Sequence, residues 1–143
     1  MYLQQISLFV ENKAGLFAEI TELLCAKGID IRALSVADTT DYGIVRLIVN
    51  NPESAAAALR DAGLAVSLTS VLAIGVEDRP GGLTHALRVL ADNDVSVEYM
   101  YAFISREENR AYVVARVGDN ERAEKVLNEA GIPLLDGSVL CGM

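Results

Sequence analysis

The chain has 143 residues, of which 52% are hydrophobic and 6% aromatic, with no tryptophan. Its formal net charge of −8 opposes binding to phosphodiester backbones and to anionic lipids, so we expect neither nucleic acid nor a membrane as a partner. No apolar run approaches the roughly 18 residues that suggest a membrane span, and no basic signal-peptide start is seen, which favours a cytoplasmic location.

The two cysteines, Cys25 and Cys141, lack the spacing of a metal site. We expect both to be reduced and Cys25 to be a small core residue of a helix. Neither a metal nor a cofactor is expected.

The first half of the chain predicts a strand, a helix, a β-hairpin, a second helix and a strand. Gly28 suits the end of the first helix, and Asp38 to Gly43 has turn composition between two apolar runs. Asn51 with Pro52 is typical of a helix start, and Gly63 of a helix end. The expected elements are, in order, strand 3–10, helix 16–27, strand 29–36, strand 44–49, helix 53–62 and strand 65–71.

The second half predicts the same order of elements. The expected segments are strand 72–76, helix 83–93, strand 95–104, turn 105–110, strand 111–117, helix 120–130 and strand 134–141.

The two halves are also similar in sequence. At one constant spacing Gly82 aligns with Gly15 and Leu83 with Leu16, and past a short gap the pair at 130–131 repeats the Ala-Gly at 62–63. We therefore predict an α+β protein in which a ferredoxin-like βαββαβ unit occurs twice, each copy an antiparallel four-stranded sheet with both helices on one face. The predicted domains are residues 1–70 and 71–143.

Each repeat places a glycine-containing turn between its first strand and first helix. We call residues 12–16 the first glycine turn and residues 78–83 the second. Glycine lets the backbone approach a ligand closely, and a helix N-terminus favours an anionic group such as a carboxylate. Gly81 and Gly82 lack a Cβ, whereas Ala14 restricts the first copy, so the second glycine turn is predicted to dominate binding.

Two polar residues near the second glycine turn have ordinary structural explanations as well as functional ones. Asp78 could accept a hydrogen bond from a ligand ammonium or could cap the helix. His85, the one histidine, is better explained as a solvated or capping residue than as a catalytic base, because it has no nucleophile in register.

Other functions that the ferredoxin-like fold supports are less consistent with the sequence. A metal carrier would need a Cys-x-x-Cys turn after the first strand, which is absent. Tyr99, Tyr101 and Phe103 alternate along one strand as in some RNA-binding sheets, but the acidic charge opposes RNA and such a pattern is more typical of a packed sheet face.

The run from Asp78 to Leu83, followed by a helix and by Val95 to Tyr99, resembles the ACT domain, a regulatory module that binds amino acids. The first repeat resembles it through residues 12–16 and 28–31, so the resemblance covers nearly the whole chain in tandem. It implies an amino-acid ligand at the interface between two modules, held by the glycine turn of one and the second strand of its neighbour. The implied ligand-binding residues are Asn12, Ala14, Gly15, Leu16, Ile29, Asp30, Ile31, Asp78, Pro80, Gly81, Gly82, Leu83, Val95, Ser96 and Val97.

The expected function is that of a non-enzymatic amino-acid sensor that regulates a partner enzyme or transporter. The alternative is a small metabolic enzyme on the same fold. Open edge strands on two small repeats further predict a homodimer.

Overall fold

The computed structural model describes residues 2–38, 41–103 and 108–141. The chain forms two compact units. The first unit consists mainly of Gln4–Thr69 and the second mainly of Ser70–Val139.

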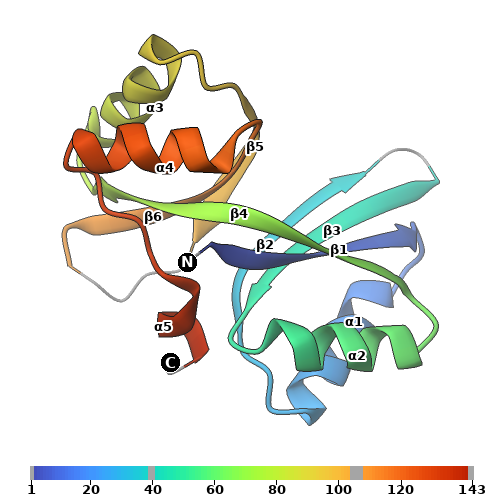
Figure 1. Ribbon diagram of the computed structural model, residues 1–143. Helices are drawn as coiled ribbons and strands as arrows, with labels where there is room; N and C mark the ends of the chain where they lie inside the picture. The colour runs from blue at the N-terminus through green and yellow to red at the C-terminus, as the bar shows by residue number, and fades with distance from the viewer. Residues whose placement is uncertain (1, 39–40, 104–107, 142–143) are drawn as a thin grey trace. The chain divides into compact units, whose positions relative to one another are not determined.

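The first unit has the predicted βαββαβ order. Its sheet has the strand order β2-β3-β1-β4, with β1 and β2 both antiparallel to β3. Both helices lie on one face of this sheet (Figure 1). The elements are β1 (Leu3–Glu11), α1 (Leu16–Ala26), β2 (Ile31–Asp38), β3 (Tyr42–Val49), α2 (Pro52–Asp61) and the start of β4 (Ala65–Glu77).

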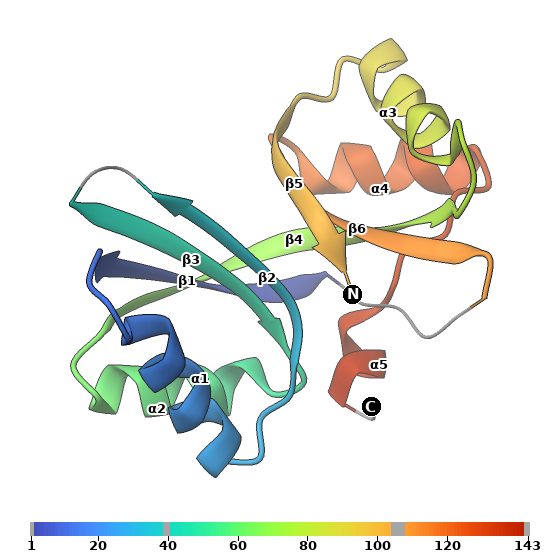
Figure 2. The same ribbon diagram turned by 180° about the vertical axis from the view of Figure 1, so that it is seen from behind.

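The second unit repeats this order up to its second helix. Its strands are arranged β4-β6-β5, with β4 and β5 antiparallel to β6, and α3 and α4 lie on one face (Figure 2). The elements after β4 are α3 (Gly82–Asp92), β5 (Val97–Phe103), β6 (Arg110–Val117), α4 (Asn120–Glu129) and α5 (Gly137–Cys141). The ferredoxin-like α+β fold is thus confirmed; of the predicted turn 105–110, residues 105–107 lie outside the described residues.

Two strand predictions need correction. The strands expected at 65–71 and 72–76 are one continuous strand, β4. The strand expected at 134–141 is wrong: Leu134 forms only an isolated bridge with Ile74, and the chain then turns into α5. Asp136 accounts for this change, because its carboxylate accepts the Ser138 N–H at 2.9 Å and its carbonyl accepts the Val139 N–H at 3.0 Å, a local arrangement that competes with strand pairing.

Each unit has its own core between its sheet and its two helices. In α1 the buried residues are Leu16, Ile20 and Leu24, which recur every four residues and so share one face. Cys25 lies one position past this face and is exposed, so its expected place in the core is wrong. The corresponding buried residues of α3 are Gly82, Ala86 and Leu90.

The predicted helix ends are confirmed where the sequence signals were strongest. Asn51 caps α2 by accepting the Ser54 N–H at 3.2 Å, with Pro52 next to it, and Gly28 and Gly63 have positive φ just past the ends of α1 and α2.

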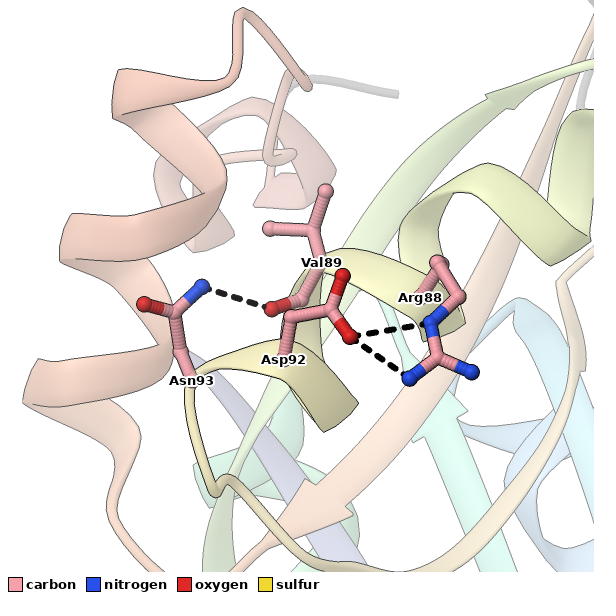
Figure 3. Close-up of polar contacts among 4 residues, drawn as sticks. All are labelled: Arg88, Val89, Asp92 and Asn93. Carbon is pink, nitrogen blue, oxygen red and sulfur yellow. Dashed lines mark hydrogen bonds and ion pairs between the residues drawn. The ribbon is translucent and has the colours of Figure 1, made fainter.

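Asn93 ends α3 in a different way. Its side-chain amide donates to the Val89 carbonyl at 2.8 Å, and nearby the Arg88 guanidinium contacts the Asp92 carboxylate at 2.6 Å (Figure 3). The hydrogen bond from Arg88 holds the pKa of Asp92 below its ordinary value.

The aromatic residues of β5 make ring contacts, as a packed sheet face would. Tyr99 and Tyr101 stack with their centroids 6.5 Å apart, and the buried Phe103 meets Tyr112 edge to face at 6.0 Å. Within the described residues, no helix has the length and apolar character needed to cross a membrane.

Candidate functional site

The two glycine turns have nearly the same backbone. Gly15 and Gly81 both precede a helix in the left-handed conformation, with φ of 83° and 90°, which L side chains adopt at a cost. Each accepts the N–H of the residue four positions later at 3.0 Å, Glu19 in one case and His85 in the other. Glycine is therefore required at this position in both repeats.

This geometry corrects the sequence alignment of the turns by one residue. Gly15 corresponds to Gly81 rather than to Gly82, and Ala14 to Pro80. The argument that Ala14 makes the first turn stiffer than the second is therefore wrong. The real difference is one position later, where the first repeat has Leu16 and the second has Gly82.

Gly82 is required by close packing inside its own turn. A Cβ built on it would lie 1.9 Å from the Glu77 carbonyl oxygen, which also accepts the Arg79 N–H at 2.9 Å. Leu16 is a buried core residue at the same helix position. The start of α3 thus lies directly against the backbone at the end of β4. Residue 82 has no side chain to fill the space that Leu16 fills in the first repeat.

Two of the backbone donors expected to be available to a ligand, those of Gly82 and Leu16, are already engaged within the turns. The Gly82 N–H already donates to the Arg79 carbonyl at 3.0 Å, and the Leu16 N–H to Lys13 at 3.4 Å. The first four N–H groups of a helix have no acceptor within it, so the next donors along α3 are those of Leu83 and Thr84. Neither glycine turn has a side-chain cap, so Asp78 does not cap α3.

The expected contributions from the second strands lie elsewhere in each unit. Ile29 to Ile31 and Val95 to Val97 follow the far ends of α1 and α3, and an 11-residue helix is about 16 Å long. The Asp30 carbonyl accepts the Asn50 N–H, and the Ser96 carbonyl accepts the Gly118 N–H, both at 3.2 Å. Within one unit the structure does not bring these segments to the glycine turn.

The second glycine turn borders a cavity of about 300 Å³, which we call the second cavity. Gly81 and Gly82 are the only predicted residues in its lining, while Asp78, Pro80 and Leu83 are exposed outside it. The lining consists of Gly75, Val76, Glu77, Arg79, Gly81, Gly82, His85, Ala86, Arg110, Ala130, Gly131, Ile132 and Pro133.

The first unit has a cavity of about 340 Å³ in the corresponding place, which we call the first cavity. Leu16 is the only predicted residue in its lining, and Asn12, Ala14 and Gly15 are exposed outside it. The lining consists of Phe9, Val10, Glu11, Lys13, Leu16, Tyr42, Gly63, Leu64 and Ala65.

Each residue that lines the first cavity has a counterpart in the lining of the second, which also includes Gly81, His85, Ala86 and Ala130. Glu11 lies opposite Tyr42 in the β1–β3 pairing, just as Glu77 lies opposite Arg110 in the β4–β6 pairing. Sequence reasoning predicted Leu16, Gly81 and Gly82 as site residues but missed the rest of the two linings, although one signal for them was visible. The repeated Ala-Gly at 62–63 and 130–131, noticed as evidence of duplication, contributes Gly63 to one cavity and Ala130 with Gly131 to the other.

The chemistry at the second cavity suits binding of a polar ligand. Arg79 forms an ion pair with Glu77, and His85 is exposed in the first turn of α3, as expected. No group of three or more metal-ligating side chains occurs within residues 2–38, 41–103 and 108–141.

Comparisons with known proteins agree with this architecture. A protein from Bacteroides thetaiotaomicron of known crystal structure is 38% identical over 100% of this chain and 98% of its own, with a TM-score of 0.92. The regulatory subunits of aspartate kinase from Thermus thermophilus and Thermus flavus share the fold at 16% identity. Their TM-scores are 0.67 and 0.62, over 92% of this chain and 92% and 94% of theirs.

No protein of curated function matches the sequence. The family model described as an ACT domain pair matches residues 1–141. The match spans both units, each with its strand, glycine turn and helix. The chain therefore belongs to the ACT domain-pair family.

Proposed function

We propose that this chain is a non-enzymatic regulatory protein that binds a free amino acid beside its glycine turns. The observation that carries the proposal is the duplicated arrangement itself, a left-handed glycine, a helix N-terminus and an adjoining cavity, in both units of an ACT domain pair. Cavities of this size lie at the lower end of the range for small-ligand sites, roughly 300–1,000 Å³. A free amino acid is a ligand of suitable size.

The ligand carboxylate is proposed to accept backbone N–H groups at the start of the helix. Charge-assisted hydrogen bonds of this kind contribute roughly 1.5–3 kcal/mol each. The Asn12 and Asp78 side chains, both exposed in the turns, are proposed acceptors for the ligand ammonium.

The strand segments at 29–31 and 95–97 are proposed to complete the site from a neighbouring module. Their distance from the glycine turn of their own unit is the reason to place them across an interface. In both units the second strand, β2 or β5, is an edge strand, with exposed apolar residues such as Leu34 and Met100. Pairing of such edges between two copies would give the proposed homodimer.

Regulation of a partner enzyme or transporter is the proposed role. Two proteins with this fold are by name regulatory subunits of aspartate kinase, which is consistent with a ligand-controlled module acting on an enzyme. The ligand would act by favouring one arrangement of modules over another.

A thermal-unfolding panel with each of the twenty common amino acids tests the proposal. A ligand present at about a hundred times its dissociation constant stabilises the folded state by about 2.7 kcal/mol, which raises the unfolding temperature by several degrees. No shift with any amino acid would contradict the proposal. Conversion of the stabilising amino acid to a product, followed by NMR, would instead favour the alternative of a small metabolic enzyme.

Light scattering at tens of micromolar protein tests the dimer. A mass of one chain, with and without the ligand, would contradict it.

A further inference from the structure

The first cavity has an aromatic wall that the second cavity lacks. Phe9 and Tyr42 stack with their ring centroids 5.3 Å apart, and the two residues are 56% and 47% exposed. At the corresponding positions the second cavity has Gly75 and Arg110. A Cβ at Gly75 would already lie 2.8 Å from the Pro133 side chain, so a ring would not fit there without a shift of its neighbours.

The aromatic wall continues onto the sheet face of the first unit. A hollow of about 320 Å³, which we call the adjoining hollow, shares Phe9 and Ala65 with the first cavity. Among the residues that it adds are Ile44 and Val66, both half-buried. A ligand side chain that extends from the first cavity past Phe9 would therefore meet further apolar surface.

The second unit covers the same surface with its own chain. The counterparts of Ile44 and Ser67 are Tyr112 and Leu135, which are only 6% and 9% exposed. The Leu135 N–H donates to the Ala73 carbonyl at 2.9 Å, so the segment after α4 lies against β4 there. In the first unit Ile44 is half-buried and Ser67 is exposed, which leaves this end of the surface open to a ligand.

The charged side chains of the first cavity lie at its turn end. Glu11 ends β1 and Lys13 belongs to the first glycine turn, whereas every other lining residue is aliphatic, aromatic or glycine. This distribution matches an amino acid whose charged head group lies at the turn and whose apolar side chain lies along the aromatic wall.

We infer, on the basis of the amino-acid binding proposed above, that the first cavity selects an amino acid with an aromatic side chain. The ligand ring lies against Phe9 and extends toward Ile44 in the adjoining hollow, while the head group stays at the first glycine turn. Aromatic rings attract one another in offset-stacked or edge-to-face pairs beyond the effect of the area that they bury, which favours an aromatic side chain over an aliphatic one. The second cavity, with Gly75 in place of Phe9, does not share this preference.

The experiment compares L-phenylalanine, L-leucine and L-alanine, which have the same head group, by titration calorimetry on the full chain. We expect L-phenylalanine to bind at least about tenfold more tightly than L-alanine, with L-leucine between them, because of the additional apolar contact. The tight binding should occur at one site per chain.

Phe9→Ala should remove most of this preference. Phe9→Leu keeps an apolar side chain in the strand and should retain the preference for L-leucine over L-alanine while reducing that for L-phenylalanine over L-leucine. Because Phe9 is more than half exposed, both replacements should be tolerated, and thermal unfolding of each variant shows whether it is folded.

Leu68→Ala is the matched control. It removes an exposed apolar side chain from β4 that lines neither the first cavity nor the adjoining hollow, and it should leave the preference unchanged.

Equal binding of L-alanine and L-phenylalanine by the unchanged protein would overturn this inference while leaving the amino-acid sensor intact. The same holds if both Phe9 variants keep the full preference, or if two sites per chain bind L-phenylalanine equally well. If no amino acid binds at all, both proposals fall together.

Discussion

Replacement of Gly82 by alanine should destabilise the protein more than replacement of any other glycine in the two glycine turns. The added Cβ would lie 1.9 Å from the Glu77 carbonyl oxygen and 2.9 Å from its carbonyl carbon. These are backbone atoms, which cannot rotate away, so either the end of β4 or the start of α3 must move. Overpacking of this kind costs roughly 1–3 kcal/mol, and loss of the Arg79 to Glu77 hydrogen bond adds about 1 kcal/mol. We expect a loss of about 3 kcal/mol in the free energy of unfolding.

Gly81→Ala is the matched control, because its cost has a different origin. An added Cβ there would have no atom within 4 Å, but φ is 90°, so only the left-handed backbone is penalised, by about 1–2 kcal/mol. Gly15→Ala, with φ of 83° and the same open space, should cost the same.

Urea denaturation followed by circular dichroism measures the three variants, with separate fits if the units unfold in separate transitions. The reasoning would be refuted if Gly82→Ala were no more destabilising than Gly81→Ala. For the same reason, valine at position 82 would not be a useful test of ligand binding. Its Cβ alone would already lie too close to the Glu77 backbone.

Three further predictions test local features. Asn51→Ala and Asp119→Ala should each lower the free energy of unfolding by about 1 kcal/mol in urea titrations, because each residue caps a helix; an unchanged midpoint would contradict the caps. The hydrogen bond from Arg88 lowers the pKa of Asp92, so its contribution is present at neutral pH and lost as pH falls through that pKa. Asp92→Asn should therefore destabilise near neutral pH but not in strong acid, and a loss that persists in acid would count against the assignment. Cys25 is exposed and should react quickly with a thiol reagent in the native protein, and this fast reaction should be absent in Cys25→Ser. Slow labelling of Cys25 would contradict its exposed position.

Periodicity and capping residues were enough to predict the order of elements. The helix α2 is the clearest case, since Asn51, Pro52 and Gly63 mark its ends by local chemistry that needs no tertiary context. The prediction of a strand at 134–141 was wrong because local hydrogen bonds decide the structure there too. Its apolar residues repeat those that form a strand in the first half, but the local hydrogen bonds of Asp136 decide in favour of a short helix.

The site was only partly predictable. The glycine turns stand out in the sequence, but two adjacent glycines leave the alignment ambiguous by one residue, and only the positive φ of Gly81 shows which one matches Gly15. The second cavity is assembled from segments far apart in the chain: the glycine turn, the start of β6 and the loop after α4. Arg110 has no motif around it, and it reaches the cavity because it lies opposite Glu77 in the β4–β6 pairing.

The net charge of the whole chain does not decide which small ligand binds in a single cavity, and the second cavity is an example. A formal charge of −8 opposes long anionic partners, whose many phosphates extend over the whole surface of the protein. A small carboxylate inside a cavity responds chiefly to charges within a Debye length, about 10 Å at 0.1 M salt, and the lining of this cavity includes two arginines, Arg79 and Arg110. A negative net charge that opposes nucleic acid is therefore compatible with the proposed binding of a free amino acid through its carboxylate.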